Sequence, residues 1–225
     1  MNVYAFYDPI GGTPSVDYIK LIDIWKKSWI YYGWNPIILN LNNINKNEYY
    51  YKYYKKCLEL NKNSFEMICF LRWLAIAEIG GWYTDLDMIN YGFYPPEKSV
   101  YENKVVTCSK YPAMCPFTIY MTKEKYKDVI LDSILNYNLS DTDILDINGI
   151  TQPYTSDMMI INKTCYSKVD ICLSTQEDYN VGTDYKNSTV VHYTTPCMNF
   201  FPNNSEKTRT QIILEDIRSA KFINN

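Results

Sequence analysis

The chain has 225 residues, of which 47% are hydrophobic, and this is enough to fill the core of one domain of ordinary size. Its formal net charge of -3 excludes the basic surface that nucleic acid requires, and no apolar run approaches the roughly 18 residues of a membrane span. A protein with this charge that handles phosphates needs a counter-charge, which a metal ion usually supplies.

The first elements predicted along the chain form a β–α–β unit. Residues 3–7 are a short β-prone run, and residues 36–40 read as a second strand that is buried on both faces. Between them, apolar residues recur at helical spacing over residues 16–32, and Gly33 then ends the helix. Two strands joined by a helix favour a parallel, right-handed unit.

The remaining elements continue the alternation of helices and strands, without an internal repeat or a linker. The sequence therefore predicts one α/β domain. We expect helices over residues 47–60, 64–79, 123–137 and 206–222, and strands over residues 105–109 and 190–193, with Ile160 and Ile161 in a further strand.

Two features of the composition bear on the setting of the protein. The seven cysteines form no CxxC pair and no zinc spacing, and the N-terminus lacks the charged and apolar regions of a secretory signal, so we expect reduced thiols in the cytoplasm. The 23 tyrosines, beside many Asn, Ile and Lys residues, are typical of an AT-rich coding genome. Some of these tyrosines alternatively serve as aromatic platforms for sugar rings.

The helix predicted over residues 64–79 carries the first functional signal. It is apolar nearly all round, which indicates a buried helix, yet it contains Arg72, a permanent cation. Its neighbours three and four residues away on the helix are Ile, Cys and Ala, none of which can pair with it. Because an unpaired buried charge costs several kcal/mol, Arg72 must find a carboxylate or a phosphate elsewhere.

Two acidic residues follow that helix after a glycine pair. Gly80 and Gly81 end the helix, because glycine takes the left-handed conformation without strain, and the chain extends again before Asp85 and Asp87. In an extended stretch, residues i and i+2 point the same way, so both carboxylates are expected to face one side. Two hard oxygen ligands held together suit Mg²⁺ or Mn²⁺ and leave positions open for a substrate phosphate.

A lone D-x-D occurs by chance in many proteins, but the longer pattern around this one is more specific. The DXD glycosyltransferases with the GT-A fold, which include yeast-type mannosyltransferases and large glucosylating toxins, have a sugar-binding region that closely resembles Arg72-Trp73-x-Ala75-x-x-Glu78-x-Gly80-Gly81-Trp82-Tyr83-x-Asp85-Leu86-Asp87. The resemblance covers roughly residues 64–90. In size and AT-rich composition the chain is also similar to short glycosyltransferases of large algal viruses, which would place it in the cytoplasm of a host cell.

This resemblance implies an α/β fold with a Rossmann-like mixed sheet flanked by helices, in a single GT-A-like domain over residues 1–225. Residues 1–90 would form the nucleotide-binding half and residues 91–225 the acceptor-side half. The implied activity is that of a metal-dependent hexosyltransferase. It would move a sugar from a nucleoside diphosphate sugar, expected to be a UDP-sugar, to a hydroxyl of an acceptor glycan, with Mn²⁺ or Mg²⁺ as cofactor.

The resemblance also implies roles for residues of the motif. Asp87 binds the metal directly, and Asp85 reaches it through water or contacts the ribose and the sugar. Arg72 contacts the donor or steadies the motif, and Leu86 belongs to the same nucleotide-sugar-binding set. Many members have an Asp three residues before the Arg, where this chain has Cys69, so one expected sugar contact is missing.

A late histidine often completes the metal shell in such enzymes, and His192 is the only histidine of the chain. Neutral imidazole is a good Mn²⁺ ligand near neutral pH, so His192 is predicted to bind the metal. The alternative is a structural histidine in a strand. Some relatives place a Lys shortly after this His to hold the diphosphate, but residues 194–198 contain no cation, so another group must supply that charge.

Three further residues are candidates at the donor and acceptor. At the end of the first predicted strand, Tyr7 could stack on uracil and Asp8 could accept its ring N–H, although Tyr7 could equally pack on the core. Asp157 precedes an apolar run in a region where inverting enzymes often keep the general base that deprotonates the acceptor hydroxyl. A helix N-cap is an equally good interpretation of Asp157.

Two other classes of function compete with this interpretation. A non-catalytic protein on the same fold could bind nucleotide-sugars or carbohydrates, although such relatives usually lose an Asp of the motif and both are present here. A phosphatase of the haloacid dehalogenase type also begins with D-x-D on a strand. In that class, however, the motif follows an apolar strand, whereas here it follows Gly-Gly-Trp-Tyr-Thr.

Overall fold

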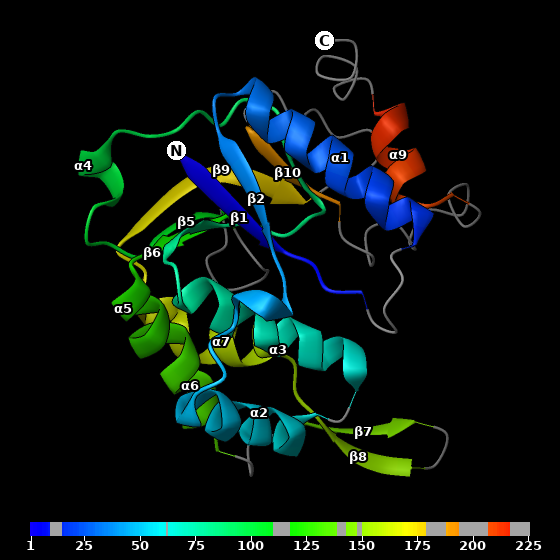
Figure 1. The fold of residues 1–225 in the computed structure, drawn as a ribbon, viewed down its shortest axis with the longest axis vertical. Helices are drawn as coiled ribbons and strands as arrows, with labels where there is room; N and C mark the ends of the chain where they lie inside the picture. The colour runs from blue at the N-terminus through cyan, green and yellow to red at the C-terminus, as the bar shows by residue number, and fades with distance from the viewer. Residues whose placement is uncertain are drawn as a thin grey trace.

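The structure is a computed structural model of the whole chain (Figure 1). It describes residues 1–9, 15–61, 63–109, 118–138, 143–147, 150–178, 188–193 and 207–216.

A mixed sheet of eight strands forms the centre of the fold. Its spatial order is β2 (Asn35–Leu39), β1 (Asn2–Phe6), β3 (Gly81–Tyr83), β6 (Ile119–Met121), β5 (Val106–Ser109), β9 (Ile171–Asp178), β10 (Val190–His192) and β4 (Met88–Asn90). A separate antiparallel pair consists of β7 (Asp143–Ile147) and β8 (Ile150–Tyr154).

The N-terminal half of the sheet is parallel, as the β–α–β pattern predicts. β1 pairs in parallel with β2 on one side and with β3 on the other, with Val3 opposite both Pro36 and Trp82. β6 runs antiparallel to both β3 and β5, while β9 runs parallel to both β5 and β10. The strands β1, β3, β5, β9 and β10 therefore share one direction, and their carboxyl ends lie at one edge.

Helices cover both faces of this sheet (Figure 1). On one side lie α1 (Val16–Tyr31) and α9 (Arg209–Glu215), and on the other side lie α2 (Glu48–Leu60), α3 (Ser64–Ala77), α6 (Asp132–Leu135) and α7 (Asp157–Cys165). Shorter elements complete the described chain: η1 (Leu41–Asn43), α4 (Lys98–Tyr101), α5 (Lys123–Lys125), the π-helical η2 (Tyr126–Leu131) and η4 (Tyr166–Lys168).

The sheet separates two hydrophobic clusters. In β1, Tyr4 and Phe6 belong to the cluster on the α3 side, while Val3 and Ala5 belong to the cluster on the α1 side. This alternation follows from the two-residue period of a strand, and it explains why β1 is apolar on both faces. The predicted α/β class, with a mixed sheet flanked by helices, is confirmed.

Several predicted elements differ from the structure. Ile160 and Ile161 lie within helix α7, not in a strand, because a short apolar run has no period that separates the two structures. The helix predicted over residues 206–222 is Arg209–Glu215 in the described residues, and residues 217–225 lie outside them. The strands β4, β6 and β9 were not predicted, and two of them have only three residues.

The glycine pair after α3 behaves as the sequence predicts. Gly80 and Gly81 have φ angles of 74° and 109°, in the region that favours glycine. A Cβ on Gly80 would stand 2.7 Å from the backbone nitrogen of Lys123, so that site is both left-handed and closely packed. This turn carries the chain from α3 directly into β3.

We predict that Gly80→Ala lowers the free energy of unfolding by about 2 kcal/mol or more, because it adds the backbone clash to about 1–2 kcal/mol of left-handed strain. Gly33→Ala, at φ 85° with its nearest atom at 3.8 Å, should show the strain alone. Gly92→Ala has neither problem and serves as the control. Equal losses for all three variants in urea denaturation would contradict this account.

Among the described residues, no helix is both long and apolar enough to cross a membrane.

Candidate active site

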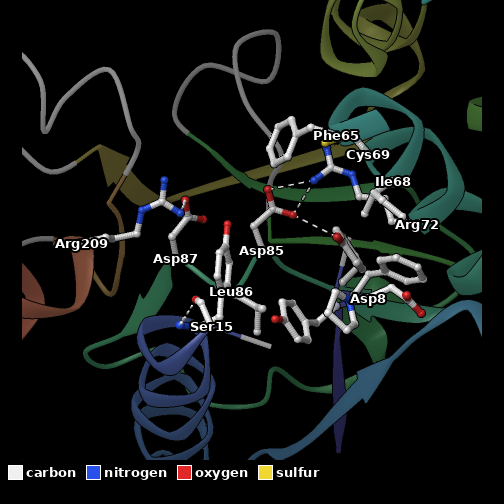
Figure 2. Close-up of a pocket in the computed structure, with 15 residues that line it drawn as sticks. Asp8, Ser15, Phe65, Ile68, Cys69, Arg72, Asp85, Leu86, Asp87 and Arg209 are labelled. Carbon is white, nitrogen blue, oxygen red and sulfur yellow. Dashed lines mark hydrogen bonds and ion pairs between the residues drawn. The ribbon is translucent and has the colours of Figure 1, made fainter. Parts of the chain in front are cut away.

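A pocket of about 360 Å³ opens at the carboxyl edge of the parallel strands. In open α/β sheets, ligands bind outside these strand ends. Six residues that the sequence singles out line this pocket: Tyr7, Asp8, Arg72, Asp85, Leu86 and Asp87. They come from the chain segments that follow β1 and β3 and from α3 (Figure 2).

The two acidic residues of the motif lie in a turn between β3 and β4. The Met88 N–H donates to the carbonyl of Asp85 at 3.1 Å, which closes the turn. The chain does extend again after the glycine pair, as β3, but the expectation of an extended conformation over residues 85–87 is wrong. Leu86 is 8% exposed and packs into the cluster on the α1 side, and both flanking carboxylates still reach the pocket.

Asp85 is held by Arg72 from the opposite wall. The Arg72 Nη1 atom donates to both carboxylate oxygens of Asp85, at 2.9 and 3.0 Å, and the Tyr83 hydroxyl donates to Oδ1 at 3.0 Å. Burial raises the pKa of the Asp85 carboxyl, and the charge of Arg72 acts against that rise. These contacts fix the orientation of Asp85 within the pocket.

A second carboxylate holds Arg72 from behind. Oδ2 of Asp157 accepts from Nη2 of Arg72 at 2.6 Å and from Nε at 3.1 Å, and it accepts from Trp73 Nε1 at 2.7 Å. Oδ1 accepts from the N–H of Met158 at 2.8 Å. The carboxylate partner that the sequence requires for Arg72 is confirmed, and there are two such partners.

The charge on Arg72 is permanent in this setting. Burial acts to lower its pKa, but Asp157 and Asp85 outweigh burial and hold the pKa well above its ordinary value. The side chains of Arg72 and Asp157 are only 9% and 1% exposed, so water screens this pair weakly. Asp157 begins helix α7 and is not among the residues that line the pocket.

Asp87 lies between two basic side chains. Nη1 of Arg209, at the start of α9, is 2.9 Å from Oδ2, and Nε2 of His192 is 3.4 Å from Oδ1. Burial acts to raise the pKa of Asp87, but His192 and Arg209 outweigh it, so this pKa lies below its ordinary value. Figure 2 shows Arg209 and Arg72 reaching the two acidic side chains from opposite sides.

The predicted metal ligands are only partly brought together. Oδ1 of Asp87 is buried, and Nε2 of His192 lies 3.4 Å from it, so a carboxylate oxygen and a ring nitrogen converge as a metal would require. Asp85 is instead directed at Arg72 and Tyr83. Asp87 and His192 therefore fit a divalent ion, and Asp85 fits an indirect role.

A second group of possible metal ligands adjoins the pocket, because one of its three residues, Cys69, lines the pocket. The ligand atoms of Glu66, Cys69 and Asp157 lie within 4.8 Å of one another. Both oxygens of Asp157, however, already accept hydrogen bonds, and burial raises the pKa of Cys69 to about 12, with Arg72 acting against the rise. A metal there would have to compete with Arg72 for the same carboxylate.

The two residues predicted at the base of the nucleotide lie on the pocket wall. The ring of Tyr7 stacks on Tyr18 of α1, with centroids 5.3 Å apart and planes at 29°. Oδ2 of Asp8 accepts from the N–H of Leu41 at 2.9 Å, which ties the end of β1 to η1. Their roles toward a base stay predictions.

Arg209 is the functional candidate that sequence reasoning missed. It lies 122 residues after Asp87 in the numbering, outside any recognisable motif, and only the packing of α9 against α1 brings it to the pocket. Residues 194–198 contain no cation, and Arg209 is a cation that lines the pocket.

Comparisons with known proteins give one structural likeness. No protein-family model matches the chain, and no curated protein matches it. Among solved structures, the fold is similar to one described as a glycosyltransferase involved in the glycosylation of the major capsid of PBCV-1. The two share 10% sequence identity over 100% of this chain and 98% of the other, with a TM-score of 0.45. This likeness assigns no role to any residue, so the roles below rest on contacts within this chain.

We predict that Asp157→Ala lowers the free energy of unfolding by about 3–5 kcal/mol, because it removes one of the two carboxylates that compensate the buried Arg72. Asp23→Ala, which breaks an exposed pair with Lys27, should cost at most about 1 kcal/mol. Chemical denaturation of both variants measures the difference. Similar losses for the two would show that the Arg72–Asp157 contact is not a structural support.

Proposed function

We propose that this chain is a glycosyltransferase that moves a hexose from a nucleoside diphosphate sugar, UDP-sugar being the expected donor, to a hydroxyl of an acceptor glycan. The observation that carries this proposal is the pairing of both acidic residues of one turn with cations in a pocket at the carboxyl edge of parallel strands. At about 360 Å³, the pocket lies within the roughly 300–1,000 Å³ range of small-molecule sites.

Binding of the donor diphosphate requires positive charge, which the two arginines supply. Arg72 is locked between two carboxylates and keeps Asp85 in place, so its role is to position the motif. Arg209 contacts one pocket carboxylate and stands on the pocket wall, where its guanidinium can pair bidentately with phosphate oxygens. We assign to Arg209 the charge that residues 194–198 lack.

We further propose that Asp87 and His192 hold a divalent cation, Mn²⁺ or Mg²⁺, with Asp85 acting from its fixed position beside them. Bound there, such an ion would neutralise charge on the diphosphate as it leaves. The buried Oδ1 of Asp87, 3.4 Å from Nε2 of His192, supports this ligand pair.

The walls near β1 support a nucleoside site. The stacked pair of Tyr7 and Tyr18 offers an aromatic surface next to Asp8, and a pyrimidine base needs both a stacking face and an acceptor for its N–H. Phe65 and Leu86 line the same pocket and can exclude water from the reacting bond.

Asp157 remains a proposal as a general base, and its contacts support a different role. A base must reach the acceptor hydroxyl, whereas Asp157 has both oxygens engaged and is not among the residues that line the pocket. We favour Asp157 as a positioning residue that acts through Arg72. The phosphatase alternative requires a nucleophilic carboxylate, and the bonds from Arg72 and Tyr83 to Asp85 weigh against it.

We propose a cytoplasmic setting for this reaction. Four cysteines of the described part of the chain carry free thiols: Cys57, Cys69, Cys108 and Cys165. Free thiols of this kind are typical of a reducing compartment.

We predict that Asp87→Asn reduces UDP-sugar hydrolysis and transfer by roughly 100-fold or more, because it removes the charge that holds the cation. Mn²⁺ affinity, measured by water-proton relaxation, should fall in parallel while the thermal melting curve shows a folded protein. Asp23→Asn on the surface of α1 is the control. Undiminished metal-dependent hydrolysis by Asp87→Asn would overturn the proposed function.

We predict that Arg209→Ala weakens UDP binding by roughly 10- to 100-fold, the usual effect of losing a hydrogen-bonded charge. Arg209→Lys should lose less, because it keeps the charge but not the planar fork. Lys207→Ala, which removes a nearby exposed cation paired with Glu215, is the matched control. Calorimetric titration with UDP measures all three, and equal affinities for Arg209→Ala and the wild type would exclude Arg209 from the donor site.

A further inference from the structure

A second hollow of about 410 Å³ lies between η1, α2 and α3. It shares one residue with the pocket at the strand ends, because Ile68 of α3 lines both. The two cavities are therefore neighbours across the first turns of α3, whose exposed Phe65 lies at the strand-end pocket. We call the second hollow the α2–α3 groove.

The walls of the α2–α3 groove differ from those of its neighbour. Apart from Lys46 and the hydroxyl of Ser64, its lining is aliphatic or aromatic, whereas the strand-end pocket contains two arginines and three aspartates. A groove with so little charge suits a neutral ligand rather than a phosphate or a charged peptide.

Two tyrosines form one wall of the groove. Tyr50 and Tyr54 are one helical turn apart on α2, with ring centroids 5.9 Å apart and planes at 23°. Tyr54 is 36% exposed and Leu58, one turn further on, is 39% exposed, so this wall is open to solvent. Each Tyr offers a flat apolar face with a hydroxyl at its edge.

A sugar ring has matching properties: an apolar face of C–H groups and a rim of hydroxyls. We infer that the α2–α3 groove binds a sugar unit of the acceptor glycan, at a distance from the end that receives the new sugar. This inference rests on the proposed function, and it adds the class of acceptor, which is an oligosaccharide rather than a monosaccharide. In this interpretation the tyrosines of α2 are aromatic platforms for sugar rings, which is the alternative that the sequence offers to compositional bias.

This placement differs from the division of the chain expected from the sequence. The groove is built from residues 41–71, within the half expected to bind the nucleotide, and not from residues 91–225. Helix α3 therefore serves both sites: Arg72 faces the donor pocket and Leu71 faces the groove.

The test compares acceptors of increasing length with the full-length protein, UDP-sugar and Mn²⁺. Gluco-, galacto- and manno-oligosaccharides from mono- to tetrasaccharide serve as probes, and the KM for each acceptor is measured. We expect the KM to fall with chain length for at least one series. Tyr54→Ala should raise the KM for the longer acceptors by roughly 3- to 10-fold, as expected for loss of an aromatic contact, and have little effect on the monosaccharide.

Two control variants separate the groove from general damage. Tyr54→Phe keeps the ring and should restore most of the affinity for longer acceptors. Tyr94→Ala removes a ring that is 65% exposed and lines neither the groove nor the strand-end pocket, and it should match the wild type. A KM that is independent of length, or a length effect that Tyr54→Ala leaves intact, would overturn the inference.

A binding experiment separates this inference from the proposed function. Saturation-transfer NMR with the same oligosaccharides, without donor, reports binding that Tyr54→Ala should weaken. If the protein binds oligosaccharides in this way but neither hydrolyses any UDP-sugar nor transfers a sugar from it, sugar binding in the groove is supported and the proposed glycosyltransferase activity is overturned. If the protein hydrolyses a donor but NMR detects no oligosaccharide binding, the proposed activity is supported and sugar binding in the groove is overturned.

Discussion

Arg72 is a permanent cation on a helix that is buried on nearly every side. The arrangement of the pocket follows from the carboxylates that compensate this charge. The helix cannot pair it internally, so two carboxylates from outside approach it, one from the β3–β4 turn and one from α7. Because both contacts are poorly exposed, water screens the attraction in each less than in a surface ion pair, and removing either carboxylate leaves charge in a poorly hydrated site. Arg72 thus links the motif to a segment more than 70 residues further along the chain.

The second carboxylate of the turn, Asp87, has different ion-pair partners. Asp87 pairs with Arg209 and approaches His192, two groups that belong to late segments of the chain. One acidic residue is therefore fixed by a buried network, while the other pairs with Arg209, which itself lines the pocket. This division suits a site that must keep a motif rigid and still take up an anion. Helix α3 has a second role, because it carries Arg72 and also borders the α2–α3 groove proposed for the acceptor.

Local patterns in the sequence predicted the parts that depend on local physics. The β–α–β start, the burial of the helix at residues 64–79 and the glycine turn all follow from periodicity and backbone preference. The need of Arg72 for a carboxylate was predictable, but Asp157 as its partner was not, because only the packing of α7 on α3 creates that contact. The turn at Asp85–Asp87 was missed because it goes with the burial of Leu86 in the cluster on the α1 side, which is a tertiary effect. Arg209 is hidden for the same reason.

The central claim is that Asp87 and His192 hold a divalent cation beside a diphosphate in the strand-end pocket. A crystal of the protein grown with Mn²⁺ and UDP, measured for anomalous scattering from manganese, tests it most directly. The account predicts an anomalous peak beside Asp87 and His192, with the diphosphate next to Arg209 and Asp85 still bound to Arg72. A manganese peak at Glu66, Cys69 and Asp157 instead, or UDP bound away from the β3–β4 turn, would contradict it.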